Sequence, residues 1–146
     1  MRNYLAIIMV IFISYSMRAQ NDDITIDANN NTIPNSQMMF KGMSVESLTD
    51  FFYKNISNIK EIDKIMSYKF YQTTPFKEFS KLIESKNTQF GKFISKEVIK
   101  VEYSNDKHKA TIFLKVKYSK VESKEQIVFL KEFEKDSYNI VEYFVQ

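Results

Sequence analysis

The chain has 146 residues, of which 15% are aromatic, with one histidine, two glycines and no cysteine. Without cysteine it forms neither a disulfide nor a thiolate metal site, and a single histidine leaves zinc sites and histidine-based triads without their usual residues. Two glycines cannot build a glycine-rich phosphate loop. We therefore expect no cofactor and no metal site. The histidine, His108, is predicted to lie in a surface turn.

Residues 1–19 have the layout of a secretory signal peptide. Arg2 precedes an uncharged apolar core, Leu5 to Ile13, and small residues lead to an expected cleavage site after Ala19. The core is shorter than the roughly 20 residues that span a bilayer, so we favour cleavage over an uncleaved anchor and expect no stable membrane span afterwards. The protein would then be exported to the periplasm or the medium, and without cysteine it would not be a lipoprotein.

Removal of this segment changes the charge balance. The formal charge of the whole chain is +3, but both arginines, Arg2 and Arg18, precede the cleavage site. The remainder has 21 − 2 = 19 lysines against 18 acidic residues, a net charge of +1. It lacks the planar guanidinium fork that makes bidentate phosphate and guanine contacts. Its lysines alternate with acids as on a solvated surface, so we expect no nucleic-acid partner.

Residues 20–40 are polar and rich in asparagine, which predicts a flexible linker ahead of a single domain over residues 41–146. Helical spacing then predicts three helical stretches. The first is capped by Ser44 or Ser47, and the second follows a bend near Ser57.

The third stretch begins around Pro75, which is pre-organised for the start of a helix, and ends at Gly91. Its apolar positions share one face: Phe76, Phe79, Leu82, Ile83 and Phe90.

Period-two alternation predicts four strands in the last third of the chain, over residues 97–103, 110–119, 126–134 and 138–145. Polar turns are predicted at residues 104–107, 122–124 and 134–137. Because these connections are short, the strands should pair as antiparallel hairpins. Helices followed by strands indicate the α+β class, with the helices packed on one face of a curved four-stranded antiparallel meander, in the shape of a cone.

The order of elements resembles the cystatin-like cone fold of nuclear transport factor 2 and ketosteroid isomerase. Within this superfamily the chain is similar to small exported bacterial proteins of uncharacterised function. Three segments carry the resemblance, Phe90–Ile99, Glu125–Leu130 and Tyr138–Val145. In the last one, Tyr138 and Glu142 stand where that group has tryptophan and glycine. The resemblance implies the fold and a concave face that can hold a small apolar ligand, but no activity.

The mouth of such a cone is where a ligand site is expected, and the candidates are Tyr103, Tyr118, Tyr138 and Glu142. Simple alternation places Glu142 on one face with Ile140 and Phe144, and Val141 and Tyr143 on the other. If the first face were concave, Glu142 would be a buried carboxylate with a raised pKa, able to act as a general base or a ligand anchor. If it is convex, which we favour because unpaired acids are rarely buried, Glu142 is solvated.

The last two strands carry apolar residues on both faces, whereas a sheet with one solvated face should alternate. This surplus predicts an association surface on the outer sheet face, formed by Val128, Leu130 and Phe144. Homodimers through this face are also common among folds that the chain resembles.

These observations lead first to an exported, non-enzymatic binding module, dimeric through its sheet. A carrier of a small apolar ligand and, last, an enzyme similar to ketosteroid isomerase remain the alternatives.

Overall fold

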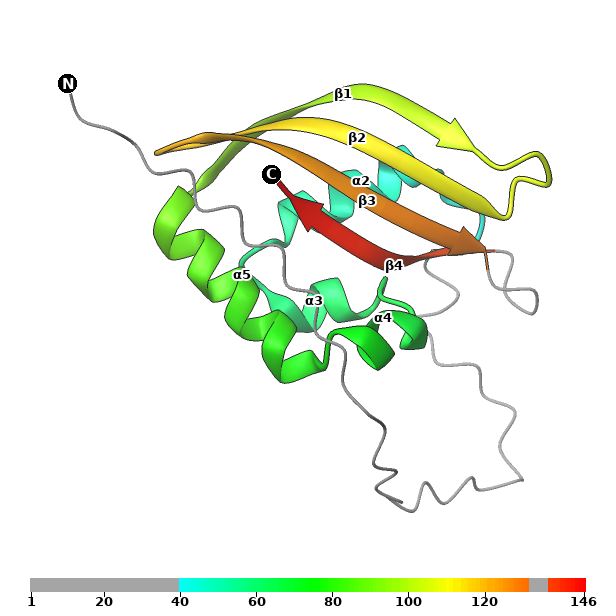
Figure 1. Ribbon diagram of the computed structural model, residues 1–146, viewed down its shortest axis with the longest axis horizontal. Coiled ribbons are helices and arrows are strands. Elements are labelled where there is room, and N and C mark those ends of the chain that lie inside the picture. The colour runs from blue at the N-terminus through cyan, green and yellow to red at the C-terminus, as the bar shows by residue number, and fades with distance from the viewer. Residues whose placement is uncertain (1–39, 132–136) are drawn as a thin grey trace, which may run out of the picture. The chain divides into compact units, whose positions relative to one another are not determined.

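The computed structural model describes residues 40–131 and 137–146, which all belong to one compact unit, Ile33–Gln146. The helices come first and the strands follow (Figure 1): α2 Val45–Lys54, α3 Ile59–Asp63, α4 Tyr68–Thr73, α5 Phe76–Phe90, β1 Phe93–Tyr103, β2 Lys109–Tyr118, β3 Glu122–Lys131 and β4 Tyr138–Val145. The sheet is antiparallel with the order β1-β2-β3-β4, which confirms the predicted meander and the α+β class.

The helix boundaries follow local chemistry. Ser44 caps α2, because its side chain accepts a hydrogen bond from the Ser47 amide at 3.2 Å. The predicted break near Ser57 separates α2 from α3. The second predicted stretch is not one helix, since it is interrupted at Met66, which forms a parallel bridge with Ile140. Ser67 donates its amide to the Ile140 carbonyl at 2.8 Å, so backbone from the α3–α4 connection pairs with part of the free edge of β4.

The helices and the curved sheet form two layers: in Figure 1, α2 lies behind the strands, and α3, α4 and α5 lie below them. Alternate residues of β2 point into the space between the layers and are fully buried: Ala110, Ile112, Leu114 and Val116. From the helices, Phe52 and Phe79 reach the same core and are also fully buried. Phe40, the last residue of the predicted linker, is buried and packs edge-on against Phe51.

Two of the expected strand details are wrong. The turn predicted at residues 122–124 lies earlier, at residues 119–121, and β3 already begins at Glu122. In β4, a β-bulge at Val141 interrupts the alternation, because Val128 and Phe129 pair with Glu142 and Ile140. Ile140 therefore points into the core, while Glu142 and Phe144 are exposed. The alternation that grouped these three residues on one face does not hold.

The predicted signal peptide, most of the predicted linker and the predicted turn at residues 134–137 fall outside the described residues, except for Phe40 and Ser137. Among the helices that are described, none has the length and apolarity that crossing a bilayer requires.

Gly91 ends α5, as predicted. Its backbone conformation and its close approach to Ser119 predict that a larger residue at this position destabilises the fold. Gly91 has φ +81° and ψ −161°, a combination that is essentially restricted to glycine, and a Cβ at this position would lie 2.0 Å from the Ser119 Oγ. We expect Gly91→Ala to lower the free energy of unfolding by about 2–4 kcal/mol, measured by urea denaturation. Gly42→Ala is the matched control, because Gly42 also has positive φ (+72°) but nothing within 4 Å. Equal losses in both variants would show that the contact with Ser119 is unimportant.

Candidate functional site

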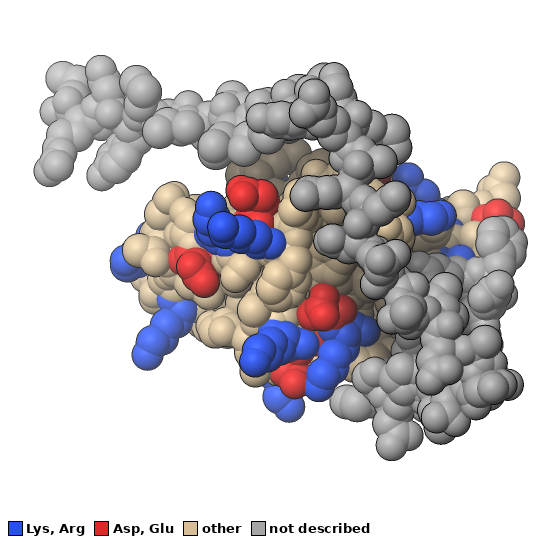
Figure 2. Space-filling model, turned by 90° about the horizontal axis from the view of Figure 1, so that it is seen from below, with Lys and Arg blue, Asp and Glu red and all other residues tan. Residues whose placement is uncertain are grey.

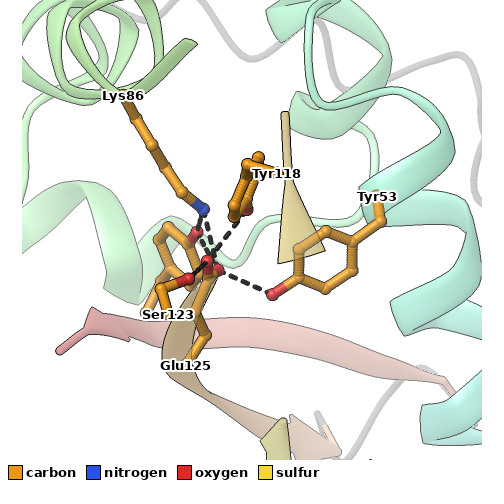
Figure 3. Close-up of polar contacts among 6 residues, drawn as sticks. Tyr53, Lys86, Tyr118, Ser123 and Glu125 are labelled. Carbon is orange, nitrogen blue, oxygen red and sulfur yellow. Dashed lines mark hydrogen bonds and ion pairs between the residues drawn. The ribbon is translucent and has the colours of Figure 1, made fainter. Parts of the chain in front are cut away.

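A carboxylate buried between the sheet and the helices is the centre of the polar structure. Both oxygens of Glu125 accept hydrogen bonds, and its side chain is 0% exposed. The Oε2 atom accepts from the Tyr53 hydroxyl at 2.7 Å, the Lys86 Nζ at 2.7 Å and the Tyr143 hydroxyl at 2.5 Å. The Oε1 atom accepts from Tyr118 at 2.8 Å and from Ser123 at 2.6 Å (Figure 3). We call these six residues the Glu125 cluster.

Side chains of the Glu125 cluster come from α2, α5, β2, β3 and β4, and the periodicity of these elements turns them inward. In β3, Ser123 and Glu125 precede Ile127 on the inward face, since residues two apart in a strand point the same way. In α5, Phe79, Ile83 and Lys86 are the buried residues, at the i, i+4 and i+7 positions of one helix face. Tyr53 from α2, Tyr118 from β2 and Tyr143 from β4 supply the phenols.

Aromatic rings surround the Lys86 ammonium. Its Nζ lies 4.7 Å from the ring centroid of Tyr118, 4.9 Å from that of Tyr143 and 5.9 Å from that of Tyr53. The ring of Phe90, one helical turn further along α5, is at 6.0 Å. Nζ also donates a hydrogen bond to the Tyr143 hydroxyl. The ammonium is thus held by a carboxylate on one side and by the negative faces of aromatic rings around it.

Burial and pairing act in opposite directions on the two charged groups. Burial by itself would raise the pKa of Glu125, but the charge of Lys86 and the hydrogen bonds from Lys86, Ser123 and Tyr143 outweigh it and hold that pKa below its ordinary value. At Lys86 burial is the larger effect, and it lowers the pKa of the amine to about 8 despite the opposing charge of Glu125. Glu125 is therefore ionised at neutral pH. Of the two charged groups, Lys86 has the pKa that lies closer to neutral pH.

The three phenols remain protonated. Burial and the negative charge of Glu125 raise the pKa values of Tyr53 and Tyr118, so both hydroxyls stay hydrogen-bond donors. The pKa of Tyr143 is also raised, by burial and by the negative charge of Glu125. A carboxylate with five donors from its own chain has no lone pair left for a substrate proton. In this arrangement Glu125 acts as a structural acceptor and not as a general base.

The four predicted ligand residues are not brought together. Tyr118 alone belongs to the Glu125 cluster. Tyr103 is exposed at the opposite end of β1 from Phe93, the residue that pairs with Tyr118. Tyr138 is half-buried and donates to the Lys107 carbonyl. Glu142 is exposed on the outer face, as the favoured alternative had it. His108 lies in the β1–β2 turn, as predicted.

The predicted interface residues also differ in exposure. On the outer face, Phe144 is exposed and Leu130 is half-buried, but Val128 is only 2% exposed.

Sequence reasoning missed the other five members of the cluster, Tyr53, Lys86, Ser123, Glu125 and Tyr143, although two signals pointed to Lys86 and Glu125. Lys86 occupies an apolar face of α5, three residues after Ile83 and four before Phe90. Glu125 alternates with Ile127 and Phe129, which places it on the inward face once β3 is extended to Glu122. The misplaced turn at residues 122–124 concealed that alternation.

No protein-family model, curated protein or solved structure matches the chain. Among residues 40–131 and 137–146, no group of three or more histidine, aspartate or glutamate side chains is arranged to hold a metal ion.

Removing one partner of the buried ion pair Lys86–Glu125 should lower the free energy of unfolding far more than breaking an exposed ion pair. We expect Lys86→Met to lower the free energy of unfolding by about 3–5 kcal/mol, because it leaves the buried carboxylate without its counter-charge. The double variant Lys86→Met/Glu125→Gln should lose less than the sum of the two single losses. Lys64→Met, which breaks an exposed ion pair with Glu61, is the control and should cost about 0–1 kcal/mol. Additive losses at residues 86 and 125 would contradict the coupling.

The lowered pKa of Lys86 predicts a stability change at alkaline pH. Between about pH 8 and its ordinary value of 10.5, this lysine keeps its proton in the unfolded chain but loses it in the folded one. The unfolded state then binds more protons, so the contribution of Lys86 makes the free energy of unfolding rise with pH. We expect the unfolding free energy of the native protein, minus that of Lys86→Met, to increase from pH 7.5 to pH 9.5 in urea titrations. A difference that is flat or falling over this interval would contradict the lowered pKa.

Proposed function

We propose that the protein is an exported, non-enzymatic binding module with a cone fold similar to nuclear transport factor 2, and that it associates with a second copy through the outer face of its sheet. The observation that carries this proposal is the contrast between the two faces. The polar groups of the inner face bind one another inside the Glu125 cluster, whereas large apolar side chains are exposed on the outer face.

The centre of the outer face is a row of side chains that crosses all four strands. Lys100, Phe113, Gln126 and Phe144 are successive register partners. Phe144 is 46% exposed, and Ile99, at a register shift of β1 beside this row, is 56% exposed. Exposed aromatic and aliphatic side chains of this size, grouped at the middle of a sheet, are typical of association surfaces.

Two properties of the outer face support a second copy as the partner. A hollow of about 130 Å³ is lined by residues including Ile99, Phe113, Gln126 and Gln146, and Phe144 is the register partner of Gln126. A protruding aromatic ring and a hollow on the same face suit a two-fold contact, in which each copy supplies both.

The charges of this face are also mixed, since Lys100 pairs with Glu102 at 2.7 Å and Lys115 pairs with Glu122 at 3.0 Å. Such a face does not repel its own copy. On the helix side, seen in Figure 2, lysines and acids are likewise interspersed.

The size of the sheet indicates a weak dimer. Four strands spaced about 4.8 Å apart are roughly 15–20 Å wide, and ten residues are about 33 Å long, so the face offers on the order of 500–650 Å². A standard interface buries about 800 Å² on each partner. Association in the micromolar range is therefore expected.

The two alternatives receive less support. An enzyme similar to ketosteroid isomerase would need an accessible acid in the cone, but Glu142 is solvated on the outer face and Glu125 is saturated with donors. A carrier of an apolar ligand would need space between the layers. Inward side chains such as Phe52, Phe79 and Phe129 pack that region and are fully buried.

The test is sedimentation equilibrium of the purified protein from about 1 to 200 µM, a range set by the expected weak association. We expect a reversible monomer–dimer equilibrium, and Phe144→Lys should shift it to monomer while leaving the unfolding midpoint nearly unchanged, because it places a charge where an exposed ring stood. Tyr68→Lys is the matched control, since Tyr68 is an exposed aromatic residue on α4. Val128 is unsuitable for this test because its burial would confound dissociation with unfolding. A native protein that stays monomeric throughout would rule out the proposed association.

A further inference from the structure

The surroundings of the Lys86 ammonium have the composition of a binding site for a cation. A carboxylate, a phenol that accepts a hydrogen bond, and the faces of four aromatic rings converge on a single nitrogen atom. The rings come from three tyrosines and Phe90. Four further donors besides the ammonium orient the carboxylate (Figure 3). Proteins use such aromatic cages to recognise the ammonium groups of ligands.

The contacts favour a primary ammonium ion. Lys86 Nζ donates one hydrogen bond to Glu125 Oε2 at 2.7 Å and another to the Tyr143 hydroxyl. A quaternary ammonium has no N–H group, so it would satisfy the rings but leave the carboxylate and the phenol without their donor. A neutral alcohol could form a hydrogen bond but would leave the buried carboxylate without its counter-charge.

The helix that delivers this ammonium is held by few side chains. Of the 15 residues of α5, three are buried, namely Phe79, Ile83 and Lys86. The helix has no side-chain cap at Pro75 and ends at Gly91, which has positive φ. Lys86 is thus the polar anchor of α5 in the Glu125 cluster, and it occupies the position that a ligand ammonium would take.

We propose that the Glu125 cluster is a binding site for a primary alkylammonium ion, and that the chain fills this site with its own Lys86. In this state Lys86 is an internal competitor, so an external amine gains access only when the lysine is absent or withdrawn. The ligand class follows from the occupant: a straight chain of about four carbons that ends in –NH₃⁺, as in the lysine side chain itself.

Removal of the competitor gives a direct test. We expect Lys86→Ala to have a lower thermal unfolding midpoint than the native protein and to recover several degrees, saturably, when n-butylammonium is added. The native protein should show no such rise at the same concentrations, because its site is filled. Lys81→Ala, which removes an exposed lysine from the same helix, is the matched control and should not respond.

Three further measurements distinguish a site that is specific for an ammonium ion from a cavity that any small molecule could fill. 1-Butanol should rescue Lys86→Ala less than n-butylammonium, tetramethylammonium should also be weaker, and Lys86→Ala/Glu125→Gln should lose the preference for the amine. If Lys86→Ala is unfolded, the same ligands are tested for their ability to restore its far-UV circular dichroism. Equal rescue by butanol, no rescue by n-butylammonium, or an equal response of the native protein would each overturn the proposal. The dimer equilibrium is measured separately, so this result does not depend on the proposed association.

Discussion

The ionised carboxylate of Glu125 is the constraint on which the arrangement of the layers depends. A charge removed from water is stabilised only when nearly all of its lone pairs are used and an opposite charge is close. Glu125 meets this condition with donors from α2, α5, β2, β3 and β4. The apolar contacts between sheet and helices are not directional, whereas these hydrogen bonds are. They therefore set how α2 and α5 lie against the strands, while burial of the apolar core provides most of the driving force.

The two partners of the ion pair are not equally satisfied. For Glu125, the hydrogen bonds and the charge of Lys86 stabilise the ionised form more than burial destabilises it, so its pKa is lowered. For Lys86, burial destabilises the ionised form more than Glu125 stabilises it, so its pKa is also lowered, which here favours the neutral amine. A buried lysine at this position is difficult to explain by stability alone, because an apolar residue of similar volume can be accommodated in a core when its polar partner is also replaced. The pair does provide specificity, since it defines one position for α5 along the sheet. This role is consistent with a cage that is complementary to an ammonium ion.

Features set by residues close together in the chain could be predicted from the sequence, whereas features set by contacts between distant residues could not. The meander and the Gly91 helix end follow from residues close together in the chain and were predicted, and the cap of α2 was narrowed to Ser44 or Ser47, of which the structure has Ser44. The bulge at Val141 was not predicted, because a register shift is decided by the partner strand and by the backbone contact of Ile140 with the α3–α4 connection. The Glu125 cluster was missed for a related reason. Lys86 and Glu125 are 39 residues apart, and each looks like a surface residue until the other is placed opposite it.

The spread of this cluster along the chain has a consequence for the order of folding. Tyr53 and Glu125 are 72 residues apart, and Tyr143 joins them from the last strand. During synthesis, α5 emerges with a lysine whose carboxylate partner has not yet appeared. Its amine must stay hydrated until β3 and β4 are available, so α5 cannot dock in its final position early. Closing such long loops is slow compared with helix formation. Packing of the helices onto the sheet is thereby delayed until nearly the whole domain is present, so the layered core forms in a late, cooperative step.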